Sequence, residues 1–340
     1  MCSNVLSNSA NYGIIPQSDF FDRSIANSDN TDTYYVIEGG DFVYNPRKST
    51  AAPYGPINVY EGTEVGIISP LYLCFKVEWI NKKYLYHYFK SNKWHPYMYI
   101  NGDSGARHDR VSIKDDVFLD MPLFVPSQKE QLKITLLLDA IDKRIETQKK
   151  IIEKYESLIR GLYHSVFNQP ASTLQLKDVV SVVKGQQVNG EELLEYGKYY
   201  VMNGGTEPSG YLDVCNTPAN TISISEGGNS CGYVQYNTEP FWSGGHCYSL
   251  IQKEQSVNYQ YLYHFLKYKE RNIMALRIGS GLPNVQKKDL ERFEIRVLPT
   301  KQQNRVAEIL EDVSAKCDLE KRILQGWQCQ KSYLLHNLFI

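Results

Sequence analysis

Several features that would place this chain in a membrane or outside the cell are missing from its 340 residues. No run approaches the ~18 consecutive apolar residues of a membrane-spanning helix. The first residues, Met1 to Asn4, lack the basic and apolar segments of a signal peptide. The seven cysteines are scattered without a Cys-x-x-Cys pair, which favours reduced thiols over disulfides or a zinc site. Together these absences predict a cytoplasmic protein.

Motifs of catalysis are also missing. The chain has no glycine-rich phosphate loop, no Gly-x-Ser-x-Gly, no His-Glu-x-x-His and no Asn-Pro-Pro-Tyr tetrapeptide. We therefore predict a non-catalytic protein that holds no metal and no cofactor. The formal net charge of −1 argues against a protein held to nucleic acid by bulk charge alone, although local basic patches remain possible.

What the sequence does contain is a long internal repeat. Residues 84–90 read Tyr-Leu-Tyr-His-Tyr-Phe-Lys, and residues 261–267 read Tyr-Leu-Tyr-His-Phe-Leu-Lys. A proline follows in each copy, Pro126 and Pro299, and each proline precedes a long helical pattern. Solenoid repeats recur every ~20–50 residues, so a repeat of this length indicates two copies of a whole domain.

Both helical patterns carry apolar residues at alternating steps of four and three, which is the heptad seam of a coiled coil. A single amphipathic helix of this length would be poorly buried, whereas two in one chain can bury each other's seams. We therefore predict that they pair antiparallel as a rigid spacer between the two domains. The residues predicted to pair are Ile134, Leu138, Ile141, Ile145, Ile152 and Tyr155 in the first helix, and Val306, Leu310, Val313, Leu324 and Trp327 in the second.

The predicted fold class is α+β, because short strand-like runs broken by turn residues precede a short helix in each copy. Phe42 to Tyr44 and Leu71 to Val77 are such runs in the first copy, and Thr221 to Ile224 is one in the second. The predicted division is a first domain at 1–125, a spacer helix at 126–169, a second domain at 170–298 and a second spacer helix at 299–340.

Polar loop residues cluster at similar places in both copies. Arginine, lysine, asparagine and glutamine side chains read base edges, and the cationic ones also hold phosphates, so the clusters predict two DNA-reading surfaces. Loops are polar in any protein, so for a single residue the structural interpretation carries equal weight. The candidates are Tyr44, Asn45, Arg47, Lys48, Ser104, Arg107, His108 and Arg110 in the first copy, and Lys184, Gln186, Asn203, Arg277, Ser280, Asn284, Gln286 and Lys287 in the second.

This layout resembles the specificity subunits of type I restriction–modification enzymes. Gly40-Asp41-Phe42-Val43-Tyr44-Asn45 looks like one common class of first recognition domain, and Asn203-Gly204-Gly205 followed by Ser209-Gly210-Tyr211 looks like a common second class. The entry into the first helix, Pro126 to Gln131, is also similar. The second entry, Pro299 to Gln303, departs from it by lacking the acidic residue and being one residue shorter.

The resemblance implies two target-recognition domains, each reading one half of a split double-stranded DNA target, with the helix length setting the gap between the halves. It also implies docking of two adenine-methylating subunits, which use S-adenosylmethionine, and of motor-nuclease subunits that use ATP and Mg²⁺. On the same alignment the first domain lacks a counterpart of roughly residues 174–200, which predicts a chain shortened at its start.

Two alternatives remain open. The chain could be a non-catalytic coiled-coil interaction protein that binds other proteins, or a silent, recombination-donor copy of a specificity subunit that folds but does not assemble. An enzyme with a dispersed active site is disfavoured, because no cluster of catalytic residue types is duplicated with the domain.

Overall fold

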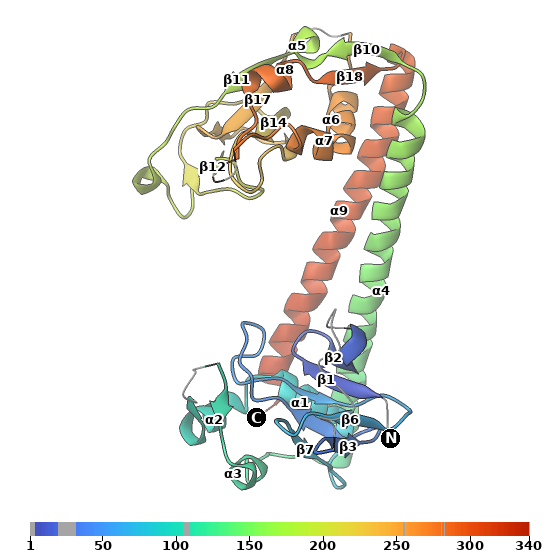
Figure 1. The fold of residues 1–340 in the computed structure, drawn as a ribbon, viewed down its shortest axis with the longest axis vertical. Helices are drawn as coiled ribbons and strands as arrows, with labels where there is room; N and C mark the ends of the chain where they lie inside the picture. The colour runs from blue at the N-terminus through green and yellow to red at the C-terminus, as the bar shows by residue number, and fades with distance from the viewer. Residues whose placement is uncertain are drawn as a thin grey trace. The chain divides into compact units, whose positions relative to one another are not determined.

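The repeated halves of the sequence fold into two compact units in a computed structural model that describes residues 4–19, 32–104, 109–253, 256–279, 281 and 283–339. The first unit combines Met1–Lys149 with Arg322–Ile340, and the second is Lys150–Lys321. Each unit contains sheets, short helices and parts of two long helices (Figure 1). The predicted α+β fold class is therefore confirmed.

Among its described residues the first unit has three small sheets, with the orders β2-β1-β6-β3, β5-β4-β7 and β8-β9. Its strands are β1 (Val5–Ser9), β2 (Gly13–Pro16), β3 (Tyr35–Ile37), β4 (Phe42–Tyr44), β5 (Ile57–Val59), β6 (Gly66–Ile68), β7 (Leu73–Phe75), β8 (Asp103–Ser104) and β9 (Val111–Ser112). Its short helices are α1 (Lys82–Lys90), α2 (His95–Asn101) and α3 (Asp115–Leu119).

The described part of the second unit has three sheets, with the orders β11-β17-β14-β15, β13-β12-β16 and β10-β18. Its strands are β10 (Ser172–Gln175), β11 (Val180–Lys184), β12 (Tyr199–Met202), β13 (Tyr211–Leu212), β14 (Thr221–Ser225), β15 (Val234–Asn237), β16 (Trp242–Ser243), β17 (Cys247–Gln252) and β18 (Glu294–Val297). Its short helices are α5 (Leu176–Val179), α6 (Tyr259–Tyr268), α7 (Glu270–Met274) and α8 (Lys287–Glu291).

The two units share one strand plan. In each, a central strand is flanked by two antiparallel partners: β4 lies between β5 and β7, and β14 lies between β15 and β17. In each, an early strand pairs parallel with a later one, β1 with β6 and β12 with β16. The duplication predicted from the sequence is therefore a duplication of fold.

The repeated Tyr-Leu-Tyr-His motif forms the equivalent helices α1 and α6. Asparagine caps both: the side chain of Asn81 accepts from the backbone N–H of Tyr84 at 3.0 Å, and that of Asn258 accepts from Tyr261 at 2.9 Å. Apolar and aromatic residues on one face of each helix enter the core of their unit. The motif recurs because the same helix face must fill the same space twice.

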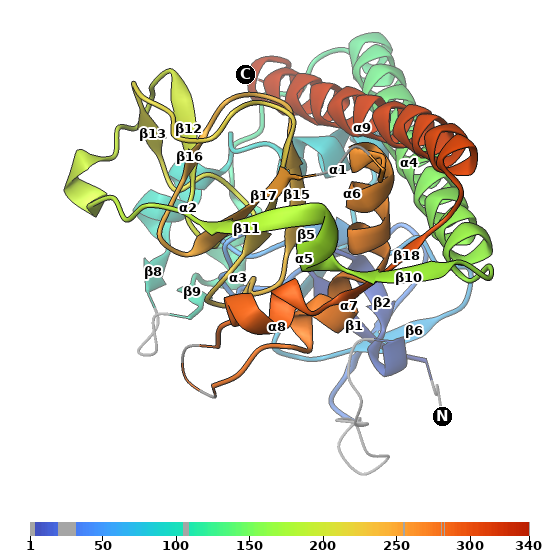
Figure 2. The ribbon, with the colours of Figure 1, turned by 90° about the horizontal axis from the view of Figure 1, so that it is seen from above.

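Two long helices are shared between the units: α4 (Gln128–Phe167) and α9 (Thr300–Asn337). Within each unit they run side by side in opposite directions (Figures 1 and 2). Lys331 of α9 forms an ion pair with Asp142 of α4 in the first unit, and Lys321 pairs with Glu156 at 3.0 Å in the second. The predicted antiparallel pairing of the helices is thus confirmed.

The seam positions of the two helices lie in the interior. Leu138, Ile141, Ile152 and Leu310 are buried. The other predicted pairing residues are half-buried: Ile134, Ile145, Tyr155, Val306, Val313, Leu324 and Trp327.

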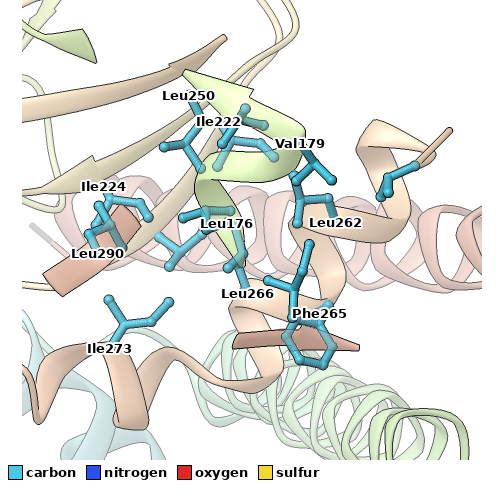
Figure 3. Packing of buried hydrophobic residues seen from close by; sticks show 14 of the residues in the cluster. Leu176, Val179, Ile222, Ile224, Leu250, Leu262, Phe265, Leu266, Ile273 and Leu290 are labelled. Atoms are coloured by element: carbon cyan, nitrogen blue, oxygen red, sulfur yellow. The ribbon is translucent and has the colours of Figure 1, made fainter. Parts of the chain in front are cut away.

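Each unit has a core that both long helices help to build. In the first unit, Leu138 of α4 and Phe339, which follows α9, pack with Tyr84 and Phe42. In the second unit, Phe167 at the end of α4 and Leu310 of α9 join a large cluster that includes Leu176, Val179, Leu250 and Phe265 (Figure 3). Each long helix therefore begins in one unit and ends in the core of the other.

A buried glutamine joins the start of each long helix to its unit. The side-chain oxygen of Gln131 accepts from the backbone N–H of Asn81 at 2.9 Å, and its amide donates to the carbonyl of Pro126 at 2.9 Å. Gln303 repeats this arrangement, accepting from Asn258 at 2.8 Å and donating to Leu298 at 2.7 Å. The same two residues that cap α1 and α6 are thereby tied to α4 and α9.

Two repeated histidines also connect the short helices to α4. The Nε2 atom of His87 lies 2.9 Å from a carboxylate oxygen of Asp139, and the Nδ1 atom of His264 lies 3.0 Å from the hydroxyl of Tyr163. Burial lowers the pKa of His264 to about 4, so this histidine is neutral at pH 7. Both histidines therefore have a hydrogen-bonding partner in the interior of their unit.

In the part of the chain that the structure describes, no helix is long and apolar enough to cross a membrane. The six cysteines that it covers are free thiols.

Candidate nucleic-acid interface

The first unit has a polar cleft of about 330 Å³ beside the end of β4. Residues from β1, from the segment 45–49 and from the position just before β9 line it, among them Asn8, Asn45, Arg47, Lys48 and Arg110. No carboxylate occurs among the described residues that line this cleft. A concave site with three cations and several amides is suited to a phosphate backbone and to base edges.

The backbone around this cleft is held by a network of hydrogen bonds. The amide of Asn45 donates to the carbonyl of Asn8 at 3.0 Å, and its side-chain oxygen accepts from the backbone N–H of Arg47 at 3.0 Å. Arg47 and Arg110 form an isolated antiparallel bridge, and the N–H of Lys48 donates to Asp109 at 2.8 Å. Two exposed arginines are thus fixed at directly opposite positions of the backbone.

Residues directly opposite in an antiparallel bridge have Cβ atoms about 4.5–5.5 Å apart, so an anion bound between Arg47 and Arg110 is within reach of both side chains. A phosphate is such an anion. The sequence placed these residues, with Asn45 and Lys48, in one cluster, and the structure brings all four together around the cleft.

Tyr44 has a different place from the one predicted. Its side chain is 2% exposed, its ring stacks on Phe118 with centroids 4.7 Å apart, and its hydroxyl donates to the carbonyl of Tyr54 at 2.9 Å. The prediction that Tyr44 contacts DNA is therefore wrong, because the ring belongs to the core. Arg107 and His108 lie outside the described residues, and Ser104 is described only through the backbone of β8.

The second unit repeats the bridge with different side chains. Gly227 pairs with Asn284 as Arg47 pairs with Arg110. The side-chain amide of Gln286 donates to the side-chain oxygen of Asn284 at 2.7 Å, which orients both amides. Arg277 is exposed nearby in sequence, and Lys287 lies 3.7 Å from Glu291. Ser280 is outside the described part of the chain.

Three candidates of the second unit remain: Lys184 ends β11, Gln186 lies two residues after it, and Asn203 directly follows β12. The indole N–H of Trp242 donates to the carbonyl of Gln186 at 3.1 Å, and this leaves the glutamine side chain exposed. The side-chain oxygen of Asn203 accepts from the backbone N–H of His246 at 3.1 Å, so the side chain of Asn203 positions the loop that carries His246.

Sequence reasoning missed Glu226, because a single glutamate in a loop carries no distinguishing pattern. Its carboxylate is 12% exposed and lies 2.8 Å from the ammonium of Lys184. It also accepts a hydrogen bond from the hydroxyl of Tyr248 at 2.9 Å. The pKa of Tyr248 is raised, mainly by burial and secondly by this carboxylate. Glu226 therefore offsets the charge of Lys184, so the candidate surface of the second unit is less cationic than the cleft of the first.

These features define a class of protein: two α+β units of one fold, each with a polar loop surface, joined by a shared pair of antiparallel helices. Residues 169–326 match the family model described as the type I restriction modification DNA specificity domain. The resemblance to type I specificity subunits that the sequence suggested is thereby confirmed.

Named relatives agree with this assignment. A putative type I specificity subunit of Mycoplasma genitalium is 31% identical over 166 residues, covering 46% of this chain and 43% of the relative. One of Mycoplasma pneumoniae is 28% identical over 166 residues, covering 48% of this chain and 44% of the relative. The chain thus spans less than half the length of these curated relatives.

Among solved structures, the S subunit of a type I restriction–modification system from M. genitalium matches with a TM-score of 0.65 and 20% identity, covering 93% of this chain and 87% of that one. A structure from a study of complex assembly of the type I system matches with a TM-score of 0.55 and 15% identity, covering 88% and 81%. At these identities the matches show the fold alone.

Proposed function

We propose that this chain is the DNA-recognition subunit of a type I restriction–modification complex. In this proposal each unit reads one half of a bipartite double-stranded DNA target and performs no chemistry itself. The observation that supports it best is the cleft of the first unit, where Arg47 and Arg110 are fixed opposite each other beside Asn45 and Lys48 without a lining carboxylate.

The partners in this proposal are two methylase subunits and motor-nuclease subunits, which carry S-adenosylmethionine, ATP and Mg²⁺. Support comes from apolar side chains that face solvent on both long helices, since exposed apolar residues mark protein interaction sites when they cluster. Leu132, Leu136 and Leu137 on α4 are 51%, 59% and 45% exposed, and Ile309 on α9 is 43% exposed. Leu137 and Ile309 occupy equivalent positions of the repeat, which fits one methylase at each.

The first test is to co-express the chain with a candidate methylase subunit and to map methylated adenines in the host DNA. The proposal expects methylation at one two-part motif with a fixed gap. Random methylation, or none, in cells where the two subunits co-purify would overturn it. Failure to co-purify with each methylase partner tried would favour the interaction-protein alternative.

A second test assigns the cleft. Arg110→Ala is expected to weaken DNA binding by the assembled complex. It should also make the slope of log K against log salt concentration less steep by about one, as for the loss of one phosphate contact. Arg305→Ala, which removes an exposed arginine of α9 away from the cleft, is the matched control. Equal losses from both variants would mean that the cleft has no special part in binding.

The partner surface has its own test. Leu137→Asp is expected to prevent co-purification with the methylase, whereas Lys133→Asp, a change at an exposed position of the same helix, should leave it intact. Retention of the methylase by the Leu137 variant would locate the docking surface elsewhere.

A further inference from the structure

Both copies of the repeated motif end in a lysine, Lys90 in α1 and Lys267 in α6. Each ammonium donates to a backbone carbonyl of the strand that follows the central strand of its unit. Lys90 reaches Ile57 of β5 at 3.5 Å, and Lys267 reaches Val234 of β15 at 2.9 Å. The two lysines therefore occupy equivalent places in the two units.

The second partners of these lysines differ. The ammonium of Lys267 forms an ion pair with Glu270 at 2.6 Å, three residues further along the chain. The residue three positions after Lys90 is Lys93, a second cation, and Lys90 forms no ion pair with any described residue. Lys90 instead donates to the side-chain oxygen of Asn58 at 2.5 Å. The charge of Lys267 is thus balanced locally, whereas Lys90 holds a neutral amide.

Lys90 determines which way the buried amide of Asn58 faces. An ammonium has only donors, so it takes the side-chain oxygen of Asn58 and leaves the NH2 group for other acceptors. That group donates to the side-chain oxygen of Asn8 at 2.6 Å and to the carbonyl of Ser9 at 3.0 Å. The NH2 group of Asn8, which is also buried, donates to the carbonyl of Val43 at 2.8 Å. One lysine therefore orients two buried amides.

The oriented asparagines lead to the cleft of the first unit. Asn58 lies in β5 and Asn8 in β1, so their contact joins the sheets β5-β4-β7 and β2-β1-β6-β3. The backbone carbonyl of Asn8 accepts from the amide of Asn45, whose side-chain oxygen accepts from the N–H of Arg47. Lys90 and Asn58 line a separate cavity of about 540 Å³, whereas Asn8, Asn45 and Arg47 line the cleft. A series of hydrogen bonds thus connects α1 to the cleft arginine.

The second unit differs at the equivalent position. Gln235 follows Val234 as Asn58 follows Ile57, but its side-chain oxygen is buried and has no hydrogen-bond partner among the described residues. The hydrogen bonds of Lys267 in the described part of the chain end at Val234 and Glu270. The series that begins at Lys90 is therefore a feature of the first unit and is not required by the shared fold.

From this difference between two copies of one motif, we infer that Lys90 is a positioning residue for the DNA-binding cleft of the first unit. It orients Asn58 and, through it, Asn8, and so holds the segment from which Arg47 extends. If either amide turned over, buried groups would lose their partners, and for this reason a single cation can hold the whole series. The inference rests on the proposed function and deepens it, since it names a residue outside the cleft that controls DNA binding.

Amide hydrogen exchange in the full-length chain without DNA tests the positioning itself. Lys90→Met removes the donor and should speed exchange of the Arg47 N–H by about fivefold to tenfold, as for the loss of one hydrogen bond. The N–H of Gly102, which donates to the carbonyl of Met98 at 2.9 Å in the same unit, is the internal reference and should change by less than about twofold. Lys267→Met is the matched control, because it removes the equivalent lysine and should leave exchange at Arg47 unchanged.

Two further variants separate the direction of the hydrogen bonds from packing. Asn58→Asp keeps a partner for Lys90 but has no N–H for Asn8, so it should speed exchange at Arg47 as Lys90→Met does. Lys90→Arg keeps a cation with donors only and should leave exchange at Arg47 within about twofold of the natural chain.

Unchanged exchange at Arg47 in Lys90→Met or in Asn58→Asp would overturn the inference, and so would equal acceleration at Gly102. Fast exchange at Arg47 in Lys90→Arg would also overturn it, because packing of the lysine rather than its donors would then be responsible.

DNA binding by the complex assembled with a methylase subunit tests the consequence. Arg47→Ala should weaken binding by about tenfold, as for the loss of one hydrogen bond to a charged group, and Lys90→Met should weaken it by less. The double variant should bind within about twofold of Arg47→Ala alone, because the lysine acts through the arginine. Additive losses would overturn the inference. Unchanged binding by Arg47→Ala, with the expected exchange results, would confirm the positioning and overturn the proposed function of the cleft instead.

Discussion

Replacing Gln303 by alanine is expected to destabilise the second unit strongly. The side chain is 1% exposed, and both ends of its amide are engaged, with the N–H of Asn258 at 2.8 Å and the carbonyl of Leu298 at 2.7 Å. Alanine leaves both groups without their partner, at about 1–3 kcal/mol for each one that stays buried. Since water can reach part of this junction, we expect a total of about 2–4 kcal/mol.

For a unit of this size each kcal/mol corresponds to about 2–4 °C in Tm, so the variant should melt roughly 4–16 °C lower. Gln303→Glu is the sharper probe. It keeps an acceptor for Asn258 but sets a carboxylate oxygen against the carbonyl of Leu298, so it should lose most of the same stability. The matched control is Gln302→Ala, an exposed neighbour that should change stability by less than about 0.5 kcal/mol.

The measurement is urea unfolding combined with amide exchange in each unit. Gln303→Ala should speed exchange in the second unit, and Gln131→Ala should speed it in the first, because each glutamine serves its own unit. The reasoning would be refuted if Gln303→Ala matched Gln302→Ala, or if Gln303→Glu were as stable as the natural protein.

Three further predictions concern stability. Burial lowers the pKa of His264 to about 4, while the value in the unfolded chain is near 6.5, so protonation favours the unfolded chain. The free energy of unfolding should therefore fall by on the order of 3 kcal/mol as the pH drops from about 6.5 through 4. His264→Gln should flatten this part of the pH profile of urea midpoints, and an unchanged slope would contradict the assignment. Leu138→Ala should lower the free energy of unfolding by about 2–5 kcal/mol, since this side chain is 0% exposed. Leu136→Ala should lower it little, since Leu136 is 59% exposed, and similar losses for both variants in chemical denaturation would argue against a buried seam at Leu138. Gly161→Ala should stabilise the protein by about 0.5–1 kcal/mol, because Gly161 lies inside α4 and a Cβ added there meets nothing within 4 Å. A lower Tm for this variant would show that the helix is strained at this position.

The paired long helices and the repeated units could be predicted from the sequence, because both leave a pattern that extends over many residues. The heptad residues Leu138 and Leu310 lie where the pattern put them, because a buried seam on a helix constrains residue type at every turn. The repeated motif at Tyr84 and Tyr261 was equally informative, since two copies of one core require the same side chains.

Contacts that depend on single polar residues could not be predicted in this way. Gln131 and Gln303 stand in helix entries that differ by an acidic residue, yet their hydrogen bonds are the same, so the similarity lies in one side chain rather than in the motif. Tyr44 was misassigned because a tyrosine at a strand end suits a binding surface and a core equally well. Glu226 became visible only when the fold placed it beside Lys184.

Phe339, which follows α9, completes the core of the first unit, and this has a consequence for biosynthesis. Phe339 is 1% exposed and packs on Tyr84 and Tyr88, which the ribosome makes some 250 residues earlier. The second unit is one uninterrupted stretch and can finish folding first, although domains usually fold in the order of synthesis. The unit that is made first must therefore wait, partly assembled, until Phe339 has been synthesised. A stop codon shortly before Phe339 would damage the first unit more than the second.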